Sequence, residues 1–494
     1  MFLLGYDIGS SSIKAALTRV DTGEKIAVLQ SPATEMEILS PQPDWAEQHP
    51  ETWWDNVCTV TRKLLQTTGI SPDEIKGIGI AYQMHGLVLV DQDRQVLRPS
   101  IIWCDSRAVA IGNRAFDAIG HEKCLSELLN SPGNFTASKL RWVWENEPEV
   151  YQRIHKIMLP GDFIAMKLTG EIMTTPGGLS EAILWDFSRN EPAGFALDYF
   201  GFDRALIPHV TPAFSLQGRL TAAAATATGL KAGTPLAYRA GDQPNNALSL
   251  NVLKPGEVAA TGGTSGVVYG IVDKPVYDPL SRVNGFAHVN HSARDPRIGV
   301  LLCINGAGIQ YSWMKHQVAL EQATYAAMEQ EAASVPPGAD GLRILPFGNG
   351  AERMLGNRNI GSKMNNLHFN RHTRAHIYRA ALEGIAFSFV YGINILKGMG
   401  LNVQVMRVGN DNLFQSDIFS STISNLVGCR IELVETTGAA GAARAAGVAT
   451  GLYRTVDEAV RDVKVITAYE PQHGIGDFEQ AYQEWFKDLQ KAII

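Results

Sequence analysis

The stretch FLLGYDIGSSSIKAALTRVDTGEKI, residues 2–26, consists of an apolar run, a turn rich in Gly and Ser, and a second apolar run. A second stretch of the same design, GEVAATGGTSGVVYGIVDKPVYD, occupies residues 256–278. Each predicts two strands joined by a tight turn. Both turns offer consecutive backbone N–H groups and hydroxyls with little side-chain bulk, so a phosphate can approach closely. One such turn is a weak signal, but two in corresponding places indicate duplicated halves that hold phosphates across a cleft.

The chain around these stretches alternates strand-like and helix-like patterns, which is typical of an α/β protein. Apolar residues recur at helical spacing over 50–69, and two apolar runs joined by QMHG lie within 75–97. A long helical pattern covers 374–400, followed by a strand in VQVMRVG and a helix over DIFSSTISNLVG. A Pro- and Gly-marked crossing near 252–256 predicts a domain boundary, which gives domains 1–250 and 251–494.

Composition limits the function classes. The chain has 494 residues, which suits two or three domains, and a net charge of −7, which argues against nucleic acid as its main partner. Its five cysteines are scattered and suit free thiols in a reducing compartment. We find no charged leader at the N-terminus and no apolar run near the roughly 20 residues that span a bilayer. We therefore expect a cytoplasmic protein without a membrane partner.

Asp7 lies at the end of the first predicted strand, beside the turn Gly9–Ser12. A carboxylate there would repel a phosphate unless a divalent cation lay between them, and Mg²⁺ prefers one or two carboxylates together with phosphate oxygens. The alternative is that Asp7 only caps the turn through backbone N–H groups. Lys14 is expected either to contact a phosphate or to be solvated.

The segment QMHG and the nearby IIWCDSRA suggest a site for a hydroxylated ligand. His85 can exchange hydrogen bonds with sugar hydroxyls and Met84 can pack on an apolar sugar face, although a lone histidine here is more often structural. Trp103, Asp105 and Arg107 form either a polyol-binding set or an ordinary salt-bridged loop.

Asp242, in AGDQPNNALSL (240–250), precedes the second phosphate turn. Gly-Asp followed by Gln-Pro-Asn marks a loop in many proteins. If phosphates are held by the two turns and a sugar lies near QMHG, however, phosphoryl transfer needs a group that deprotonates the attacking hydroxyl, as an aspartate does elsewhere. The sequence contains no GxxxxGK[ST] loop, no GxGxxG fingerprint and no Ser-His-Asp arrangement that favours another chemistry.

Taken together, these motifs resemble those of the FGGY carbohydrate kinases, and QMHGLVLVD followed by IIWCDSR is most similar to the xylulose kinases among them. The resemblance runs nearly end to end and includes DWAEQHPETWW, SKLRWVWENEPE, MLPGDFIAMKLTGE, SEAILWDF, LPFGNGAERM, RAALEGIAF and GAAGAARAAG. It implies two ribonuclease-H-like lobes of the actin-like ATPase kind with a central cleft, the first binding sugar and the second binding ATP. The implied reaction transfers phosphate from ATP, with Mg²⁺, to the terminal hydroxyl of a ketopentose, with D-xylulose expected.

Site residues follow from the resemblance position by position. Asp242 is expected as the base and Asp7 as the carboxylate of the magnesium–phosphate site. The expected sugar-binding residues are Gln83, Met84, His85, Trp103, Asp105 and Gln243. The expected nucleotide-binding residues are Gly9, Ser10, Ser11, Ser12, Lys14, Gly262, Gly263, Thr264, Gly409, Asn410 and Asn412. Because many relatives are dimers, a homodimer is the suggested assembly.

One segment departs from the family pattern. The adenosine segment usually has a run of glycines, whereas VGNDNLFQSD (408–417) keeps Gly409 and replaces the next glycines with Asn410 and Asp411. Side chains fill space that glycine leaves free, so we expect an effect on nucleotide affinity or preference, with Asn412 and GAAGAA (438–443) framing the base. The alternatives are a kinase for L-ribulose, L-fuculose, gluconate or glycerol, or a nucleotide-dependent sugar sensor without turnover.

Overall fold

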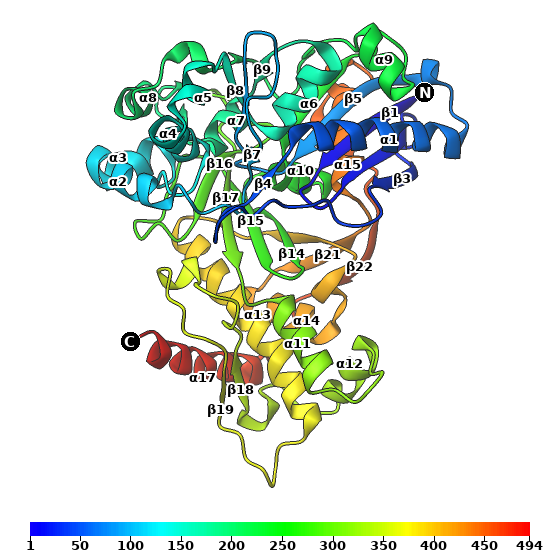
Figure 1. Cartoon of the computed structure of the whole chain (residues 1–494). Coiled ribbons are helices and arrows are strands. Elements are labelled where there is room, and N and C mark those ends of the chain that lie inside the picture. Colours follow the sequence, from blue (N-terminus) through cyan, green and yellow to red (C-terminus); the bar gives the residue numbers. More distant parts are fainter.

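The computed structural model describes all residues, 1–494, and arranges them in two lobes (Figure 1). The sheet of the first lobe has the order β13-β5-β1-β2-β3. Its strands are β1 (Phe2–Ile8), β2 (Ile13–Arg19), β3 (Lys25–Ser31), β5 (Ile75–Tyr82) and β13 (Leu236–Gly241). β1 runs antiparallel to β2 and parallel to β5, which runs parallel to β13.

The second lobe repeats this pattern within a seven-stranded sheet of order β16-β17-β15-β14-β20-β21-β22. The strands are β14 (Glu257–Gly262), β15 (Gly266–Val272), β16 (Asn284–Ala287), β17 (Ile298–Ile304), β20 (Val405–Gly409), β21 (Arg430–Val434) and β22 (Val465–Tyr469). β14 is antiparallel to β15 and parallel to β20, which is parallel to β21. The duplication predicted from the two Gly-rich hairpins is confirmed, with β16 and β22 added at the edges.

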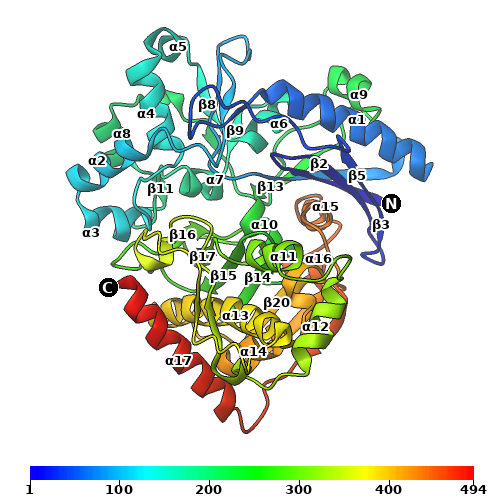
Figure 2. The same cartoon turned by 60° about the horizontal axis from the view of Figure 1, so that its bottom comes forward.

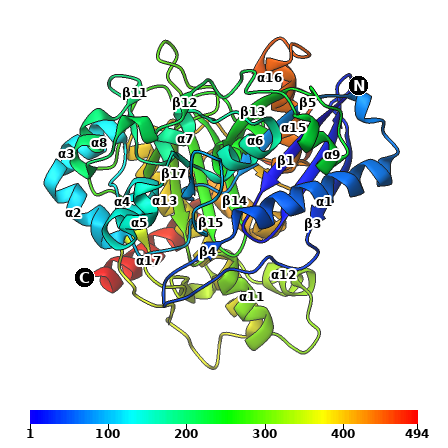
Figure 3. The same ribbon diagram turned by 45° about the horizontal axis from the view of Figure 1, so that its top comes forward.

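The two faces of the first sheet bury different helices because side chains alternate along a strand. In β1, Leu4, Tyr6 and Ile8 pack with Trp53 and its neighbours in α1 (Pro50–Thr68), which lies across the sheet in Figure 3. The other face receives α15 (Gly438–Ala449), which comes from the end of the second half of the chain.

Glycine at position 5 permits this packing. A Cβ at Gly5 would lie 2.0 Å from the carbonyl oxygen of Ala439 and 2.3 Å from the amide nitrogen of Ala443. The small-residue stretch in α15 therefore lies almost backbone to backbone on β1. The same alternation that aims Gly5 at α15 aims Asp7 at the first turn of that helix.

Helix α10 (Asp242–Ser249) contacts α15 between the two lobes (Figure 2). The Asn245 amide donates to the Gly438 carbonyl at 2.9 Å. Ala247 of α10 packs with Ala259 and Tyr269 of the second sheet, while α15 packs on the first sheet. The expected domain boundary at 250/251 follows α10, and each half of the chain contributes one helix to the other half's sheet.

Helices inserted between the sheet strands complete the lobes. Between β5 and β13 lie α2 (Val109–Ile119), α4 (Thr136–Asn146), α6 (Pro160–Thr169) and α7 (Pro176–Glu181). Between β17 and β20 lie α11 (Gly308–Gln317), α12 (Tyr325–Ala333) and α13 (Arg374–Gly398), with α14 (Asp417–Val427) after β20 and α17 (Gly476–Ile493) at the C-terminus. The helices predicted over 50–69, 374–400 and 417–428 are confirmed.

Helix α13 corrects one expectation from the sequence. It is long and apolar enough to cross a membrane by length and composition, although we expected no such run. Of its most apolar window, 78% is buried inside the protein, where it packs between α12 and α14. The apolar character of α13 is that of a helix in a protein core.

Candidate active site

Two carboxylates meet where the lobes face each other. Asp242 begins α10 directly after β13, and Asp7 precedes the last residue of β1. Both side chains are half-buried. Because β1 and β13 flank β5 as parallel strands, their carboxyl ends reach the same edge of the sheet, which is the usual place for ligands in open α/β sheets.

The environment holds the pKa of Asp242 well above that of a free carboxyl. Burial and the nearby charge of Asp7 raise it to about 7, against the hydrogen bonds from Gln243 that lower it. Burial also raises the pKa of Asp7, while Lys14, its cross-strand neighbour, lowers it. A half-buried carboxyl whose pKa lies near neutrality is suited to accept a proton.

Asp7 lies against the N-terminal turn of α15. A Cβ on Gly438 would lie 2.7 Å from Oδ2 of Asp7. Thr437 caps this helix by accepting a hydrogen bond from the Ala440 amide at 3.2 Å. The carboxylate thus lies beside the Gly-Ser turn on one side and a helix N-terminus on the other, a setting that suits a cation bridged to phosphate oxygens.

The QMHG segment forms a turn after β5 and lies close to Asp242. A Cβ on Gly241 would lie 2.7 Å from Cγ of Met84 and 3.1 Å from Oε1 of Glu181, so these two side chains border the residue before Asp242. The His85 amide donates to Oε2 of Glu181 at 2.9 Å. Burial lowers the pKa of His85 to about 3, which keeps its imidazole neutral.

The remaining sugar-site candidates differ in their surroundings. Gln83 is buried, and its amide oxygen and nitrogen have no hydrogen-bond partner in the protein. Gln243 is half-buried and adjoins Asp242. Trp103 is exposed, and its indole N–H donates to Oγ of Ser10 in the first hairpin turn at 3.3 Å.

Among the sugar-site candidates, Asp105 has its carboxylate engaged by protein groups. Its side chain is fully buried and accepts from the guanidinium of Arg107 at 2.7 Å and from the amide of Ala46 at 2.7 Å. Arg107 also pairs with Glu47 at 2.7 Å and lies over the Trp45 ring. Of the two interpretations of this loop, the structure favours the salt-bridged one, because both oxygens of Asp105 are already occupied.

A pocket of about 920 Å³ opens beside the second hairpin. Gly262, Gly263 and Thr264 line it, as does Asn412, which adopts a left-handed backbone with φ of 61°. Its volume lies in the range of sites for drug-sized ligands. The opposite wall comes from α11, α12 and the start of α14 and includes Tyr311, Ser312, Tyr325, Glu329, Gln330 and Ser416.

Two other candidates for nucleotide binding, Gly409 and Asn410, do not line this pocket. Gly409 ends β20, and the amide of Asn410 donates to the Val434 carbonyl, so these two residues extend the sheet. The expectation that GAAGAA (438–443) frames the base is wrong, since Ala439–Ala443 are buried in the α15 packing against β1 and β5. Ser10, Ser12 and Gly9 are half-buried in the first turn, whereas Ser11 and Lys14 are exposed.

Residue patterns alone did not reveal several groups at the site. Glu181 and Lys139 lie in SEAILWDF and SKLRWVWENEPE, two motifs of the family resemblance, but the sequence predicted no role for either residue. Gly438 could have been found from its position after a strand and a capping threonine. The walls formed by α11 and α12 carry no local signal, because those helices reach the pocket only through the tertiary fold.

Comparison with known proteins agrees with this architecture. The model of the FGGY family of carbohydrate kinases, N-terminal domain, matches residues 2–249, and that of the C-terminal domain matches 258–450. The chain is 28% identical to the xylulose kinase of Bacillus subtilis over 100% of this chain and 96% of that protein. It is 31% identical to the L-xylulose/3-keto-L-gulonate kinase of Escherichia coli over 94% of this chain and 91% of that protein.

Among solved structures, xylulose kinase from Rhodospirillum rubrum superposes with a TM-score of 0.89 at 26% identity and covers 99% of both chains. The paired five-strand cores are thus the two ribonuclease-H-like lobes of an actin-like ATPase fold. Since the two family models together match residues 2–249 and 258–450, the chain belongs to the FGGY family of carbohydrate kinases.

Proposed function

We propose that this carbohydrate kinase transfers the γ-phosphoryl group of ATP to the terminal hydroxyl of D-xylulose, which yields D-xylulose 5-phosphate and ADP. The observation that carries the proposal is Asp242, a half-buried carboxyl with a pKa raised to about 7 at the edge where the two lobes meet. The choice of sugar rests on relatives named xylulose kinase that align over nearly the whole chain.

In this mechanism Asp242 accepts the proton of the sugar hydroxyl as that oxygen attacks the γ-phosphorus. The bond from the γ-phosphorus to the bridging oxygen breaks, and ADP leaves with the electron pair. A carboxylate with a pKa near 7 is deprotonated in half of the molecules at neutral pH and still basic enough to assist the transfer. Gln83, Met84, His85 and Gln243 border the proposed sugar position, with Trp103 at its rim.

The nucleotide is proposed to bind in the pocket beside the second hairpin, with Gly262, Gly263 and Thr264 near its phosphates. The first turn, Gly9–Ser12, would face those phosphates from the other lobe, with Lys14 nearby. Gly409, Asn410 and Asn412 form the neighbouring segment, and of these three Asn412 lines the pocket.

Asp7 fits a magnesium site, because it supplies one half-buried carboxylate beside a Gly-Ser turn and a helix N-terminus. When bound with ATP, Mg²⁺ would neutralise charge on the phosphate oxygens. Asp7 itself would fix the position of those phosphates relative to Asp242.

We further propose that residues 1–250 and 251–494 are the sugar-binding and nucleotide-binding domains. The cytoplasm is the proposed location, since all five cysteines are free thiols, and a sugar and ATP are the proposed partners. A homodimer is the assembly to test by light scattering.

The experiment that tests the function is a coupled ADP-release assay with Mg·ATP and a panel of ketoses, aldoses and polyols. We expect the highest kcat/KM with D-xylulose and a product phosphorylated at C5, identified by phosphorus–proton coupling in NMR. Turnover with another sugar would retain the mechanism and replace the substrate. Nucleotide binding without turnover on any sugar would favour the sensor.

The panel includes L-xylulose and 3-keto-L-gulonate for a specific reason. The relative named for those substrates is 31% identical to this chain, compared with 28% for the xylulose kinase of B. subtilis. A kcat/KM that is higher for either of these sugars than for D-xylulose would identify this second candidate as the function.

A further inference from the structure

His85 has all but one of its polar groups hydrogen-bonded to the protein. Its backbone N–H donates to Oε2 of Glu181 at 2.9 Å, and its backbone carbonyl accepts from Nζ of Lys139 at 2.9 Å. On the ring, Nδ1 lies 2.9 Å from the backbone carbonyl oxygen of Glu181. Only Nε2 has no partner in the protein, and the side chain is 19% exposed.

These contacts determine which ring nitrogen carries the proton. A backbone carbonyl oxygen only accepts hydrogen bonds, so Nδ1 must donate and therefore carries the hydrogen. Burial lowers the pKa of His85 to about 3, so the imidazole is neutral at physiological pH. A neutral ring protonated at Nδ1 has a lone pair at Nε2, which can only accept a hydrogen bond.

The ring is also held in orientation by aromatic side chains from both lobes. Phe135 meets it edge-on at 4.7 Å between ring centroids, and Phe286 of β16 lies at 5.5 Å. His85 has a left-handed backbone with φ of 62°, which is uncommon for a residue with a side chain and persists where the surroundings fix it.

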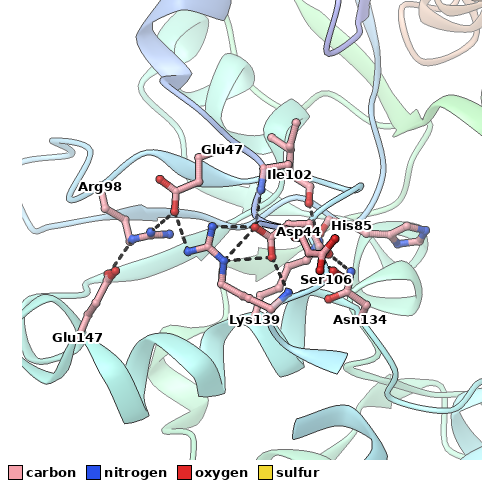
Figure 4. Close-up of polar contacts among 12 residues, drawn as sticks. Asp44, Glu47, His85, Arg98, Ile102, Ser106, Asn134, Lys139 and Glu147 are labelled. Atoms are coloured by element: carbon pink, nitrogen blue, oxygen red, sulfur yellow. Dashed lines mark hydrogen bonds and ion pairs between the residues drawn. The ribbon is translucent and has the colours of Figure 1, made fainter. Parts of the chain in front are cut away.

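Glu181 and Lys139 are both buried, and each makes a second contact that anchors it. The hydroxyl of Tyr82 donates to Oε1 of Glu181 at 2.8 Å. Lys139 donates to the Ile102 carbonyl at 2.9 Å, so its ammonium group joins the turn at His85 to the segment that begins at Ile102 (Figure 4). Neither side chain is used by the phosphoryl-transfer steps above.

We propose that the side chains of Glu181 and Lys139 are positioning groups that hold the backbone of His85, while the backbone carbonyl of Glu181 keeps Nδ1 protonated, so that Nε2 accepts a hydrogen bond from one donor hydroxyl of the sugar. The identity of that sugar rests on the proposed function, whereas the state of His85 does not. The site would then select for a hydroxyl at that position against any group unable to donate.

The first test observes His85 directly and needs no turnover. Nitrogen-resolved NMR of ¹⁵N-histidine-labelled protein, with the resonance assigned by its loss in His85→Gln, should show a proton on Nδ1 and none on Nε2 between pH 6 and 8. Sugar binding should shift the Nε2 resonance. A proton on Nε2, or an imidazolium at pH 6, would overturn the proposal whatever the substrate is.

The second test compares two substitutions at one position. In Glu181→Gln the amide oxygen can accept from the His85 N–H while the amide NH₂ donates to the Tyr82 hydroxyl, so both contacts survive; in Glu181→Leu neither does. We expect Glu181→Leu to raise KM for the sugar about 10- to 100-fold and Glu181→Gln to raise it less than about threefold. KM for ATP should stay within about twofold in both variants. A twofold change corresponds to a free energy of RT ln 2, which is small beside the loss of one hydrogen bond.

Lys139→Met should raise the sugar KM in the same way, and the exposed substitutions Glu122→Gln and Lys123→Met serve as controls. An unchanged sugar KM in Glu181→Leu would contradict the positioning role. Glu181→Gln behaving like Glu181→Leu would also contradict it, because the charge rather than the hydrogen bonds would then matter.

The third test asks for the donor on the sugar. Fluorine replaces each hydroxyl of the preferred sugar in turn, since fluorine cannot donate. One fluorinated analogue should bind the wild type about 10-fold or more weakly, and its deficit should shrink in His85→Gln, whose amide can donate to fluorine. Equal deficits in the wild type and His85→Gln for every analogue would overturn the contact.

Discussion

The two hairpins share a backbone plan but differ in charge at the same place. Counting back from the closing pairs, Ile8↔Ile13 and Gly262↔Gly266, Asp7 corresponds to Thr261. Across the strands, Asp7 faces Lys14 and Thr261 faces Val267. The duplication thus supplied two Gly-rich turns of the same backbone plan, and only the first pairs its turn with charged side chains.

The helices that follow the last core strand of each half also differ in the charge of their first residue. β13 leads into α10, which begins with Asp242, and β21 leads through a capped turn into α15, which begins with Gly438. Each helix packs on the sheet of the opposite half. Under the proposed function this difference is a division of labour, with Asp7 and Asp242 for chemistry in the first half and the nucleotide pocket, whose far wall includes Glu329 and Asp417, in the second.

The largest effect is expected at Asp242. Asp242→Asn keeps the shape of the side chain but cannot accept the proton, so kcat should fall about 10³-fold or more, while KM for the sugar changes little. Steady-state ADP release measures both, with the exposed substitution Asp457→Asn as the control. A kcat within tenfold of wild type would remove Asp242 as the base.

The next effect compares matched positions of the two hairpins. Asp7→Asn should lower kcat on the order of 100-fold and raise the Mg²⁺ concentration needed for half-maximal rate. Thr261→Val should change kcat by about threefold or less, since it removes at most one neutral hydrogen bond. Magnesium titrations of both variants decide the matter, and equal losses would show that the hairpins act alike.

Substitutions at matched strand positions beneath α15 and α10 should differ in their effect on stability. Gly5→Ala would place a methyl group against the Ala439 carbonyl and should destabilise the fold by about 3 kcal/mol or more. Its counterpart Ala259 already carries that methyl group, so Ala259→Gly should cost only about 1 kcal/mol. Urea midpoints of both variants provide the comparison, and a harmless Gly5→Ala would contradict the close approach of α15.

A further effect is a pH-dependent gain in stability. The pKa of Asp242 is about 7 in the fold and near 3.8 when unfolded, so its ionisation opposes folding increasingly as pH rises from about 4 to 7. Asp242→Asn removes this penalty and should melt at a higher temperature than wild type at pH 8, with the gain vanishing near pH 4. A gain in melting temperature that does not vary with pH would show that folding does not raise the pKa of Asp242.

The sequence predicted the fold well because its signals are local. Two Gly-rich turns between strands and the helical spacing over 374–400 need no tertiary information. Which helix covers which sheet is not local, so the role of GAAGAA was misassigned. The helix over 374–400 was predicted, but its apolar content, sufficient to span a bilayer, was not. Asp105 shows the same limit, since only the fold brings the amide of Ala46 to it and Glu47 to its partner Arg107.

The division of labour is tested most directly by calorimetric titration of each ligand alone against two variants. Ala326→Trp fills the exposed wall of the pocket on α12, and His85→Ala removes the imidazole near Asp242. We predict that Ala326→Trp weakens nucleotide binding about 10-fold or more and spares D-xylulose, while His85→Ala does the reverse. If both variants weakened both ligands equally, or if Ala326→Trp left nucleotide binding intact, the assignment of chemistry to one half and nucleotide to the other would be contradicted.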